Sequence, residues 1–222
     1  QWASLTSGAW CWYNNDSANY AATYGKLYNW YAVNDPRGLA PDGWHVPTDV
    51  EWNNMVKYLD PNADTACSIC PQSSVAAIAM KNITGWPSYA SSATNGSGFS
   101  AMPGGYRHIN GSFIAIGHEA HFWSASQLNS TYAWYRFLDT NAIKRYNYSK
   151  IDGFSVRAVK NTAITYLWSN GATGTSITAN TSGLYAVTIT SPSGCSATSN
   201  AIAINVLSAP SASIAVNGNT TS

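Results

Sequence analysis

The sequence predicts an α+β domain over residues 1–160, followed by a smaller and incomplete all-β sandwich module. Apolar residues recur at helical spacing early in the chain and alternate with polar residues after Gly98. The composition then changes near Lys160, because residues 161–222 contain no Asp, Glu, Lys, Arg or His. These observations indicate two regions of different physical character.

Two helices are expected in the first region. Thr48-Asp49-Val50-Glu51 is a capping box, and the apolar residues after it keep helical spacing until Pro61. The members of this stripe are Trp52, Met55, Val56 and Leu59. A second helix is expected over residues 22–33, where Leu27, Trp30 and Tyr31 share one stripe.

Five later segments show the alternation of half-buried strands. They are FIAIG (113–117), HFWSAS (121–126), AWYRFLD (133–139), AIKRYNY (142–148) and GFSVRAV (153–159). Because the expected helices come first, the segments predict an antiparallel sheet late in an α+β domain.

The uncharged tail is expected to form four short strands: ITYLW (164–168), TSITA (175–179), GLYAVTIT (183–190) and NAIAINVL (200–207). Turn signals such as residues 169–172 and 191–194 separate them, and alternation over residues 184–189 predicts a half-buried strand. Four strands are fewer than the about seven of a stable sandwich, so residues 161–208 are interpreted as a partial module. Residues 209–222 are interpreted as a linker and the first strand of another repeat, or as a donor strand.

The chain carries few charges. Only 9% of its 222 residues are charged, against about 25% in soluble domains. The net charge of +1 gives no basic surface for nucleic acid, and no apolar run reaches the about 20 residues that span a bilayer. Low charge with abundant Ser, Thr, Asn and Tyr indicates a secreted or cell-surface protein. We expect no nucleic-acid partner and no membrane insertion.

The cysteines allow one local interpretation. Cys67 and Cys70 form a C-x-x-C motif without the second ligand pair of a zinc site, and residues 61–64 do not resemble the strand that precedes a redox motif. A disulfide within this loop is therefore favoured over metal or redox chemistry. The pairing of Cys11 and Cys195 stays open.

Residues 121–154 concentrate aromatic side chains. Strand alternation puts Tyr132, Trp134, Arg136 and Leu138 on one face, and Trp134 and Leu138 suit a core there. The opposite face carries Tyr135, Phe137 and Asp139, a poor core set because the carboxylate needs a partner. In the next strand Lys144, Tyr146 and Tyr148 share a face. Since tyrosine is rigid and amphipathic, such a surface favours recognition of a ligand; the alternatives are contact with a neighbouring domain or simple exposure.

Several motifs carry a family resemblance. CWYNNDSANYAATYGKLYNWYAV, GLAPDGWHVPTDVEW, GFSAMPGGYR, FWSAS and GFSVRAV resemble the Fibrobacter succinogenes major paralogous domain over residues 1 to about 160. That family occurs in secreted and cell-surface proteins of the Fibrobacteres–Bacteroidetes group, and the resemblance implies a C-type-lectin-like fold. The tail YLWSNGATGTSITANTSGLYAVTITSPSGCSATS resembles immunoglobulin-like repeats of large Bacteroidetes adhesins.

The chain departs from these families at both ends. It lacks the upstream strand with a Trp-Met-x-x-Asn-Leu-like motif, and the immunoglobulin-like repeat lacks its front strands. Ala158 stands where many members have a cysteine, which leaves Cys11 without an obvious mate. We therefore expect a chain that is cut from something longer or completed by another molecule.

The aromatic stretch also resembles the variable region of lectin-fold proteins diversified by retroelements. That resemblance implies a ligand face composed of Tyr132, Tyr135, Phe137, Asp139, Asn141, Lys144, Tyr146 and Tyr148.

An enzyme is not expected. The formylglycine-generating enzymes have a similar fold and use late cysteines, but this chain has no cysteine between Pro71 and Gly194. The run His118-Glu119-Ala120-His121 is not the H-E-x-x-H metal motif, and a solvated loop is favoured there. We expect no catalytic residue, metal or cofactor.

Ser17 and Thr65 lie in Asp-Ser/Thr-Ala triplets that resemble Bacteroidetes O-glycosylation sites. Two functions are compatible with the whole sequence. The first is a binding module of a large adhesin, with a glycan or protein on a cell or surface as its ligand. The second is a subunit of an extracellular filament, in which a strand such as residues 213–216 self-associates with a neighbouring chain's module.

Overall fold

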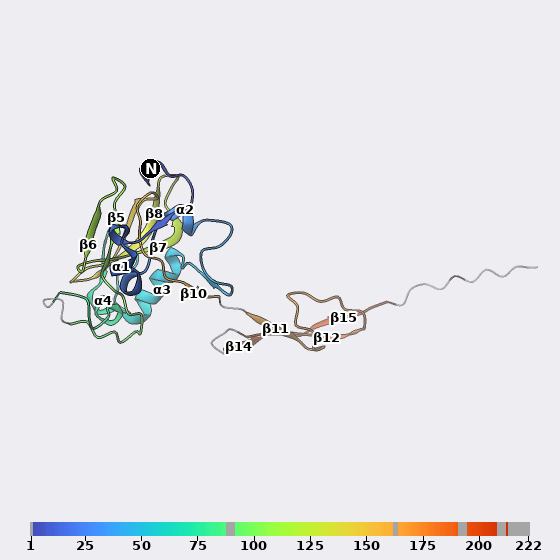
Figure 1. Cartoon of the computed structure of the whole chain (residues 1–222). Helices are drawn as coiled ribbons and strands as arrows, with labels where there is room; N and C mark the ends of the chain where they lie inside the picture. The colour runs from blue at the N-terminus through green and yellow to red at the C-terminus, as the bar shows by residue number, and fades with distance from the viewer. Residues whose placement is uncertain (1, 88–91, 162–163, 191–194, 208–211, 213–222) are drawn as a thin grey trace, which may run out of the picture. The chain divides into compact units, whose positions relative to one another are not determined.

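The computed structural model describes residues 2–87, 92–161, 164–190, 195–207 and 212. The chain divides into two compact units, Gln1–Asn161 and Thr162–Ser222, and each is described by itself. The described residues form a mixed α+β protein with more strands than helices (Figure 1). No helix among them has the length and apolar character to span a bilayer.

A six-stranded sheet organises the first unit, with the strand order β4-β9-β8-β7-β5-β6. Its strands are β4 (Cys70–Ser73), β5 (Gly104–Arg107), β6 (Phe113–Ile116), β7 (Ala120–Gln127), β8 (Tyr132–Leu138) and β9 (Ile143–Ser149). Neighbouring strands are antiparallel except for β5 and β7, which are parallel. The predicted late sheet is therefore present, and β4 and β5 extend it beyond the segments expected from alternation.

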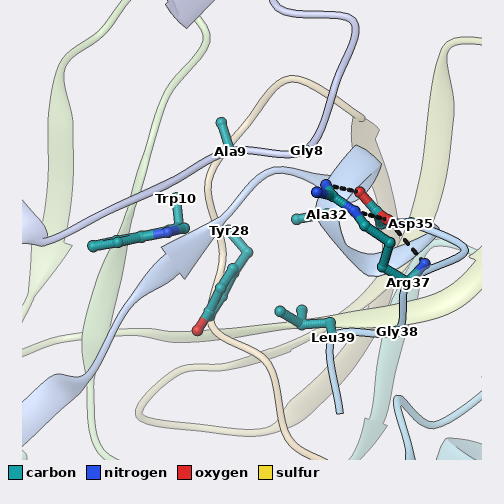
Figure 2. A pocket seen from close by; sticks show the side chains of 9 residues that line it. All are labelled: Gly8, Ala9, Trp10, Tyr28, Ala32, Asp35, Arg37, Gly38 and Leu39. Carbon is teal, nitrogen blue, oxygen red and sulfur yellow. Dashed lines mark hydrogen bonds and ion pairs between the residues drawn. The ribbon is translucent and has the colours of Figure 1, made fainter.

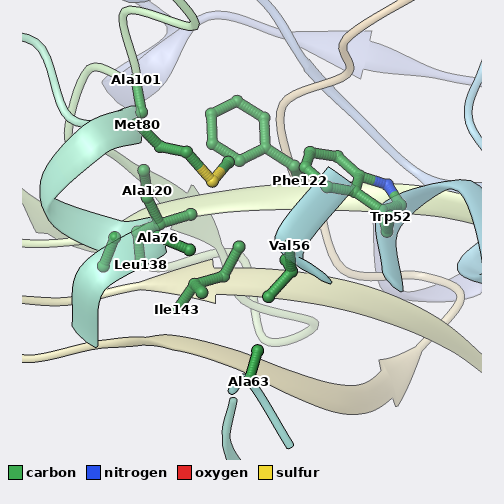
Figure 3. Close-up of a cluster of buried hydrophobic side chains, with 11 residues drawn as sticks. Trp52, Val56, Ala63, Ala76, Met80, Ala101, Ala120, Phe122, Leu138 and Ile143 are labelled. Atoms are coloured by element: carbon green, nitrogen blue, oxygen red, sulfur yellow. The ribbon is translucent and has the colours of Figure 1, made fainter. Parts of the chain in front are cut away.

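Two helices cover one face of this sheet. Helix α3 (Asp49–Leu59) begins at the predicted capping box, with both hydrogen bonds between Thr48 and Glu51 formed. Helix α4 (Ser74–Met80), which the sequence analysis missed, is capped by the Ser73 hydroxyl. Figure 3 shows side chains of α3 and α4 meeting those of β7, β8 and β9. The buried members include Trp52, Val56, Met80, Phe122, Leu138 and Ile143.

The helix expected over residues 22–33 is wrong in its bounds. The segment forms the end of α1 (Ser17–Tyr24), the strand β2 (Leu27–Tyr28) and the short helix α2 (Trp30–Val33). Gly25 has a φ of 71°, outside the helical region, and α1 ends there. Asn29 then begins α2, because its side chain accepts a hydrogen bond from the Ala32 N–H. β2 pairs with β1 (Trp10–Cys11).

The segment GFSVRAV is a strand only at its end. β10 (Val159–Lys160) pairs with β3 (Trp44–His45), whereas Phe154 and Ser155 form isolated bridges to Tyr28 and Phe122. Alternation did not reveal this split, because it depends on which distant backbone lies alongside.

A buried ion-pair network joins α3 to the sheet. Arg136 on β8 is 0% exposed and donates to Asp49 Oδ1 at 2.7 Å and to Asn53 Oδ1 at 2.6 Å. Arg145 on β9 contacts the other Asp49 oxygen at 2.7 Å and stacks 3.6 Å from the centre of the Trp134 ring. Of the two residues expected in the core, Leu138 is fully buried. Trp134 is only half-buried, because its ring lies at the surface beneath Arg145.

The second unit contains two small sheets. One has the order β11-β13-β14, from β11 (Thr165–Trp168), β13 (Val187–Thr190) and β14 (Ser196–Thr198); the other pairs β12 (Gly183–Tyr185) with β15 (Ile202–Ile204). The expected strand TSITA is absent from the described structure, and β14 was not predicted.

The predicted half-buried strand over residues 184–189 is divided between β12 and β13, and its residues are partly or fully exposed. No described residue of this unit is buried. The turn at residues 191–194 and the expected strand at residues 213–216 lie outside the described residues.

Candidate ligand face

The register of β8 and β9 brings several predicted site residues together. Phe137 pairs with Lys144, and Tyr135 pairs with Tyr146. Tyr148 lies two residues beyond Tyr146 and so shares its side of the sheet. The expectation that these five side chains share one face is confirmed.

Tyr135 is a core residue, which corrects its place in the predicted ligand face. It is 6% exposed, and its ring centre lies 4.6 Å from that of Phe154 and 5.6 Å from that of His121. Burial raises the pKa of its hydroxyl. Its ring thus supports the surface from beneath.

The partly exposed rings above this core form a surface that we call the aromatic face, composed of Tyr106, His108, Phe137, Tyr146 and Tyr148. Tyr106 and His108 were missed in the sequence, because β5 is separated from β8 and β9 along the chain and joins them through its parallel pairing with β7. The centres of the Tyr106 and His108 rings each lie 6.3 Å from that of Tyr148. No periodic signal marks Tyr106 in the sequence.

Two of these rings are in contact. The Tyr106 and Tyr148 rings meet edge to face with their centres 6.3 Å apart, and burial raises the pKa of Tyr106 to about 12. Burial also raises the pKa of Tyr148. Both phenols are therefore neutral at physiological pH, and the aromatic face offers hydrogen-bonding hydroxyls beside apolar ring surfaces.

His121 lies under the aromatic face rather than in the solvated loop that was expected. It is 5% exposed, stacks 4.8 Å from Phe137, and its Nε2 lies 3.0 Å from Glu119 Oε2. Burial lowers its pKa and outweighs the opposing effect of Glu119. A neutral imidazole therefore serves as one more packed ring.

Asp139 and Asn141 lie in the turn between β8 and β9 at one end of this surface, and Lys144 lies at the start of β9. Asp139 Oδ1 accepts hydrogen bonds from the N–H groups of Asn141 at 2.8 Å and Ala142 at 2.9 Å, and Oδ2 lies 2.7 Å from Lys144 Nζ. Burial alone would raise the pKa of Asp139, but these partners have the larger effect, and the net pKa lies below its usual value. Buried Lys81 donates to the Thr140 carbonyl at 2.9 Å and fixes the turn. Lys144 is thus the partner that the Asp139 carboxylate needs, and strand alternation alone did not predict this pair.

Tyr132 stands apart from this surface. It begins β8, is 43% exposed, and pairs with Ser149 at the opposite end of the hairpin from Asp139. Within the described part of the chain, no ring contact joins it to the aromatic face. It remains a predicted contact residue that the fold does not bring to the others.

Asp152 is the most unusual group beneath the aromatic face. It is 0% exposed, its Oδ1 accepts a hydrogen bond from the Ile109 N–H at 2.7 Å, and its Oδ2 has no partner among the described residues. Burial raises its pKa to about 6, against the opposing effect of the Ile109 bond. This carboxyl was not foreseen in the sequence.

The remaining predicted sites lie elsewhere. Cys67 and Cys70 form the expected disulfide. Asp64 lies beside it, with a carboxylate oxygen within 4.8 Å of both sulfurs. Ser17 is exposed at the first residue of α1, and Thr65 is half-exposed between α3 and β4. Cys11 is a buried free thiol and Cys195 an exposed one.

One comparison with known proteins identifies the first unit. The family model described as the Fibrobacter succinogenes major domain matches residues 1–160. No curated protein and no solved structure matches the chain. Because the matched residues make up more than half of the 222-residue sequence, the chain belongs to the Fibrobacter succinogenes major domain family.

Proposed function

We propose that this chain is a non-enzymatic binding module of a large extracellular adhesion protein. Its aromatic face contacts a glycan or protein ligand on a cell or surface, and it needs neither metal nor cofactor. The observation that carries the proposal is the half-exposed ring cluster of Tyr106, Tyr146 and Tyr148 above a buried aromatic layer.

The cluster suits recognition because its rings are held in place. Tyr148 is supported by Phe154 at 5.9 Å and by Tyr135 at 6.0 Å between ring centres. A ring that is already ordered loses little conformational entropy when a ligand binds. The Asp139–Lys144 pair at one end adds polar groups that favour a defined orientation of the ligand.

The finer fold assignments belong to the same proposal. Two helices on one face of a mostly antiparallel sheet are compatible with a C-type-lectin-like arrangement of residues 1–160. In the second unit, the Tyr185 hydroxyl donates to the Thr181 carbonyl at 2.9 Å. A tyrosine that bonds backbone a few residues upstream is typical of immunoglobulin-like sandwiches, so we propose a partial repeat of that kind over residues 161–208.

A binding assay with matched variants tests the ligand face. The double variant Tyr146→Ala and Tyr148→Ala is compared with Tyr58→Ala, whose ring on α3 is 86% exposed. The probes are a printed glycan array and immobilised extracellular-matrix proteins. We expect the double variant to lose at least tenfold in affinity for any probe that the parent binds, and the control to be unchanged. If the double variant binds as tightly as the parent, the aromatic face is not the ligand site.

A second candidate function has its own observation. The strands of the second unit leave large apolar side chains in solvent, with Leu184 68%, Ile202 65% and Leu167 54% exposed. Such surfaces favour pairing with another chain, so the module could be completed by a strand from a neighbouring subunit in a filament.

Deletion of residues 209–222 separates the two candidates. If the chain is a filament subunit, the deletion should abolish the polymers that electron microscopy and light scattering detect in the parent. The ligand affinity of the first unit should be unaffected. A parent chain that stays monomeric at high concentration would contradict the filament.

A further inference from the structure

A pair of joined hollows lies outside the aromatic face. The first, of about 380 Å³, is lined by residues that include Trp10, Tyr28, Asp35, Arg37 and Leu39. The second, of about 230 Å³, is lined by residues that include Trp44 and His45. Gly38 and Leu39 line both hollows, so the two are neighbours, and we call them together the groove.

Each hollow carries an exposed indole. Trp10 is 49% exposed and Trp44 44% exposed. Trp10 is nevertheless fixed: Lys26 Nζ lies 3.7 Å from the centre of its ring, and Trp12 lies 5.3 Å away in an edge contact. Single exposed tryptophans are common, but two that flank one groove indicate a surface for a flat, apolar group.

The polar groups of the first hollow form a neutral pair. Arg37 donates to Asp35 through Nε at 2.8 Å and Nη2 at 2.6 Å, and these bonds lower the pKa of Asp35 to about 2. The carboxylate is therefore charged and balanced by the guanidinium. Figure 2 shows the rings of Trp10 and Tyr28 on one side of the hollow and the Asp35–Arg37 pair on the other. These two are the charged residues of the lining and balance each other, and the Lys26 ammonium lies against the ring of Trp10.

The second hollow is also balanced. Its one titratable lining residue is His45, whose Nδ1 lies 2.7 Å from Asn161 Oδ1 and whose Nε2 lies 2.7 Å from Glu51 Oε1. Both ring nitrogens are thus taken up by the protein. The Trp44 ring is the prominent exposed contact surface of this hollow.

The backbone of the first hollow does not favour an extended peptide. Asn29, which is fully buried, accepts a hydrogen bond from the Ala9 N–H at 2.8 Å through its side chain. The Ala9 carbonyl in turn accepts from the Asn29 N–H at 3.0 Å. Because both polar backbone groups of Ala9 are occupied, this residue cannot pair with an added strand.

We propose that this groove binds a neutral, linear oligosaccharide. Pyranose rings carry apolar C–H faces that pack on indoles and hydroxyls that exchange hydrogen bonds with a carboxylate–guanidinium pair. One sugar unit would stack on Trp10 beside Asp35 and Arg37, and a later unit of the same chain would reach Trp44. The proposal is independent of the aromatic face and stands if the ligand of that face is a protein.

The test uses the full chain and neutral hexasaccharides of glucose, mannose, xylose and N-acetylglucosamine, measured by isothermal titration calorimetry. We expect at least one probe to bind, its trisaccharide to bind more weakly, and Trp10→Ala or Trp44→Ala to lower affinity about tenfold or more. Trp10→Phe should recover part of the affinity because it restores an aromatic face. Arg37→Ala should weaken binding through loss of hydroxyl contacts.

Two controls keep the outcome specific. Tyr58→Ala, whose ring is exposed on α3, should bind the oligosaccharide like the parent, and all variants should keep the parent's circular dichroism. The proposal is overturned if no neutral probe binds or if the tryptophan variants bind as tightly as the parent.

Discussion

Replacing Asp49 should destabilise the first unit strongly, because its carboxylate balances two arginines at the junction of α3, β8 and β9. Arg136 is 0% exposed, and Asp49 is its anionic contact at 2.7 Å. Removing one partner of a buried ion pair costs about 3–5 kcal/mol, since the other charge stays buried without compensation. We expect Asp49→Ala to fall in this range. Asp49→Asn should cost about 2–3 kcal/mol, because the amide oxygen still accepts one hydrogen bond.

The pH dependence gives a second readout of the same network. Burial raises the pKa of Asp49, but the hydrogen bonds and charges of Arg145 and Arg136 outweigh it, and the net pKa lies below its usual range. A lowered carboxyl pKa contributes stability that is present above the unfolded value of about 3.9 and is lost as the pH falls through the folded value. Asp49→Asn should therefore remove part of the parent's sensitivity to acid below about pH 4.

Urea titrations followed by tryptophan fluorescence measure this effect, because nine of the ten tryptophans lie in residues 1–161. Asp42→Asn is the matched control, since Asp42 is exposed, and its change should stay within about 0.5 kcal/mol. A double-mutant cycle with Arg136→Met isolates the pairwise contribution. A loss below about 1 kcal/mol for Asp49→Ala would refute the argument that the carboxylate compensates a buried guanidinium.

Three further predictions concern other parts of the chain. The pKa of Asp152, raised to about 6, means that the folded protein binds the proton more tightly than the unfolded chain. The parent should therefore lose up to about 3 kcal/mol relative to Asp152→Asn as the pH rises from 4 to 7, and parallel urea titrations that show no such divergence would contradict this. Gly105→Ala should lower the free energy of unfolding by about 2 kcal/mol or more, because φ is +61° and a Cβ would meet the β6 backbone; Gly117→Ala, with positive φ and open space, should cost less in the same assay. In thiol labelling of the folded chain, exposed Cys195 should react at once and buried Cys11 only after unfolding, so rapid labelling of both would show that Cys11 is not protected.

The elements that the sequence predicted well are those specified locally. The capping box of Thr48 and Glu51 fixes the start of α3, since both hydrogen bonds lie within one helical turn. Cys67 and Cys70 are three residues apart and reach each other within one loop. The helix expected over residues 22–33 does not form as one element. Gly25 ends α1, and the following residues pair with β1 as the strand β2.

The sequence by itself determined which side chains share a face of the late sheet, because alternation along a strand is a local property of the backbone. Alternation grouped Tyr135 with Phe137 in one strand and Lys144 with Tyr146 and Tyr148 in the next, and the resemblance to diversified lectin-fold proteins joined the two groups. Only the tertiary structure decided how deeply each ring lies. Tyr135 is buried because Phe154 packs over it, whereas Tyr146 and Tyr148 keep partial exposure.

The groove and the Asp49 network were likewise decided by tertiary structure. Trp10 and Trp44 belong to different strand pairs, and Asp49 is 87 residues from Arg136. No periodic pattern marks either association, because each depends on where distant segments meet once the core has closed. Burial also sets the electrostatics, since the pKa of a carboxyl such as Asp152 responds to the water excluded around it rather than to its neighbours in sequence.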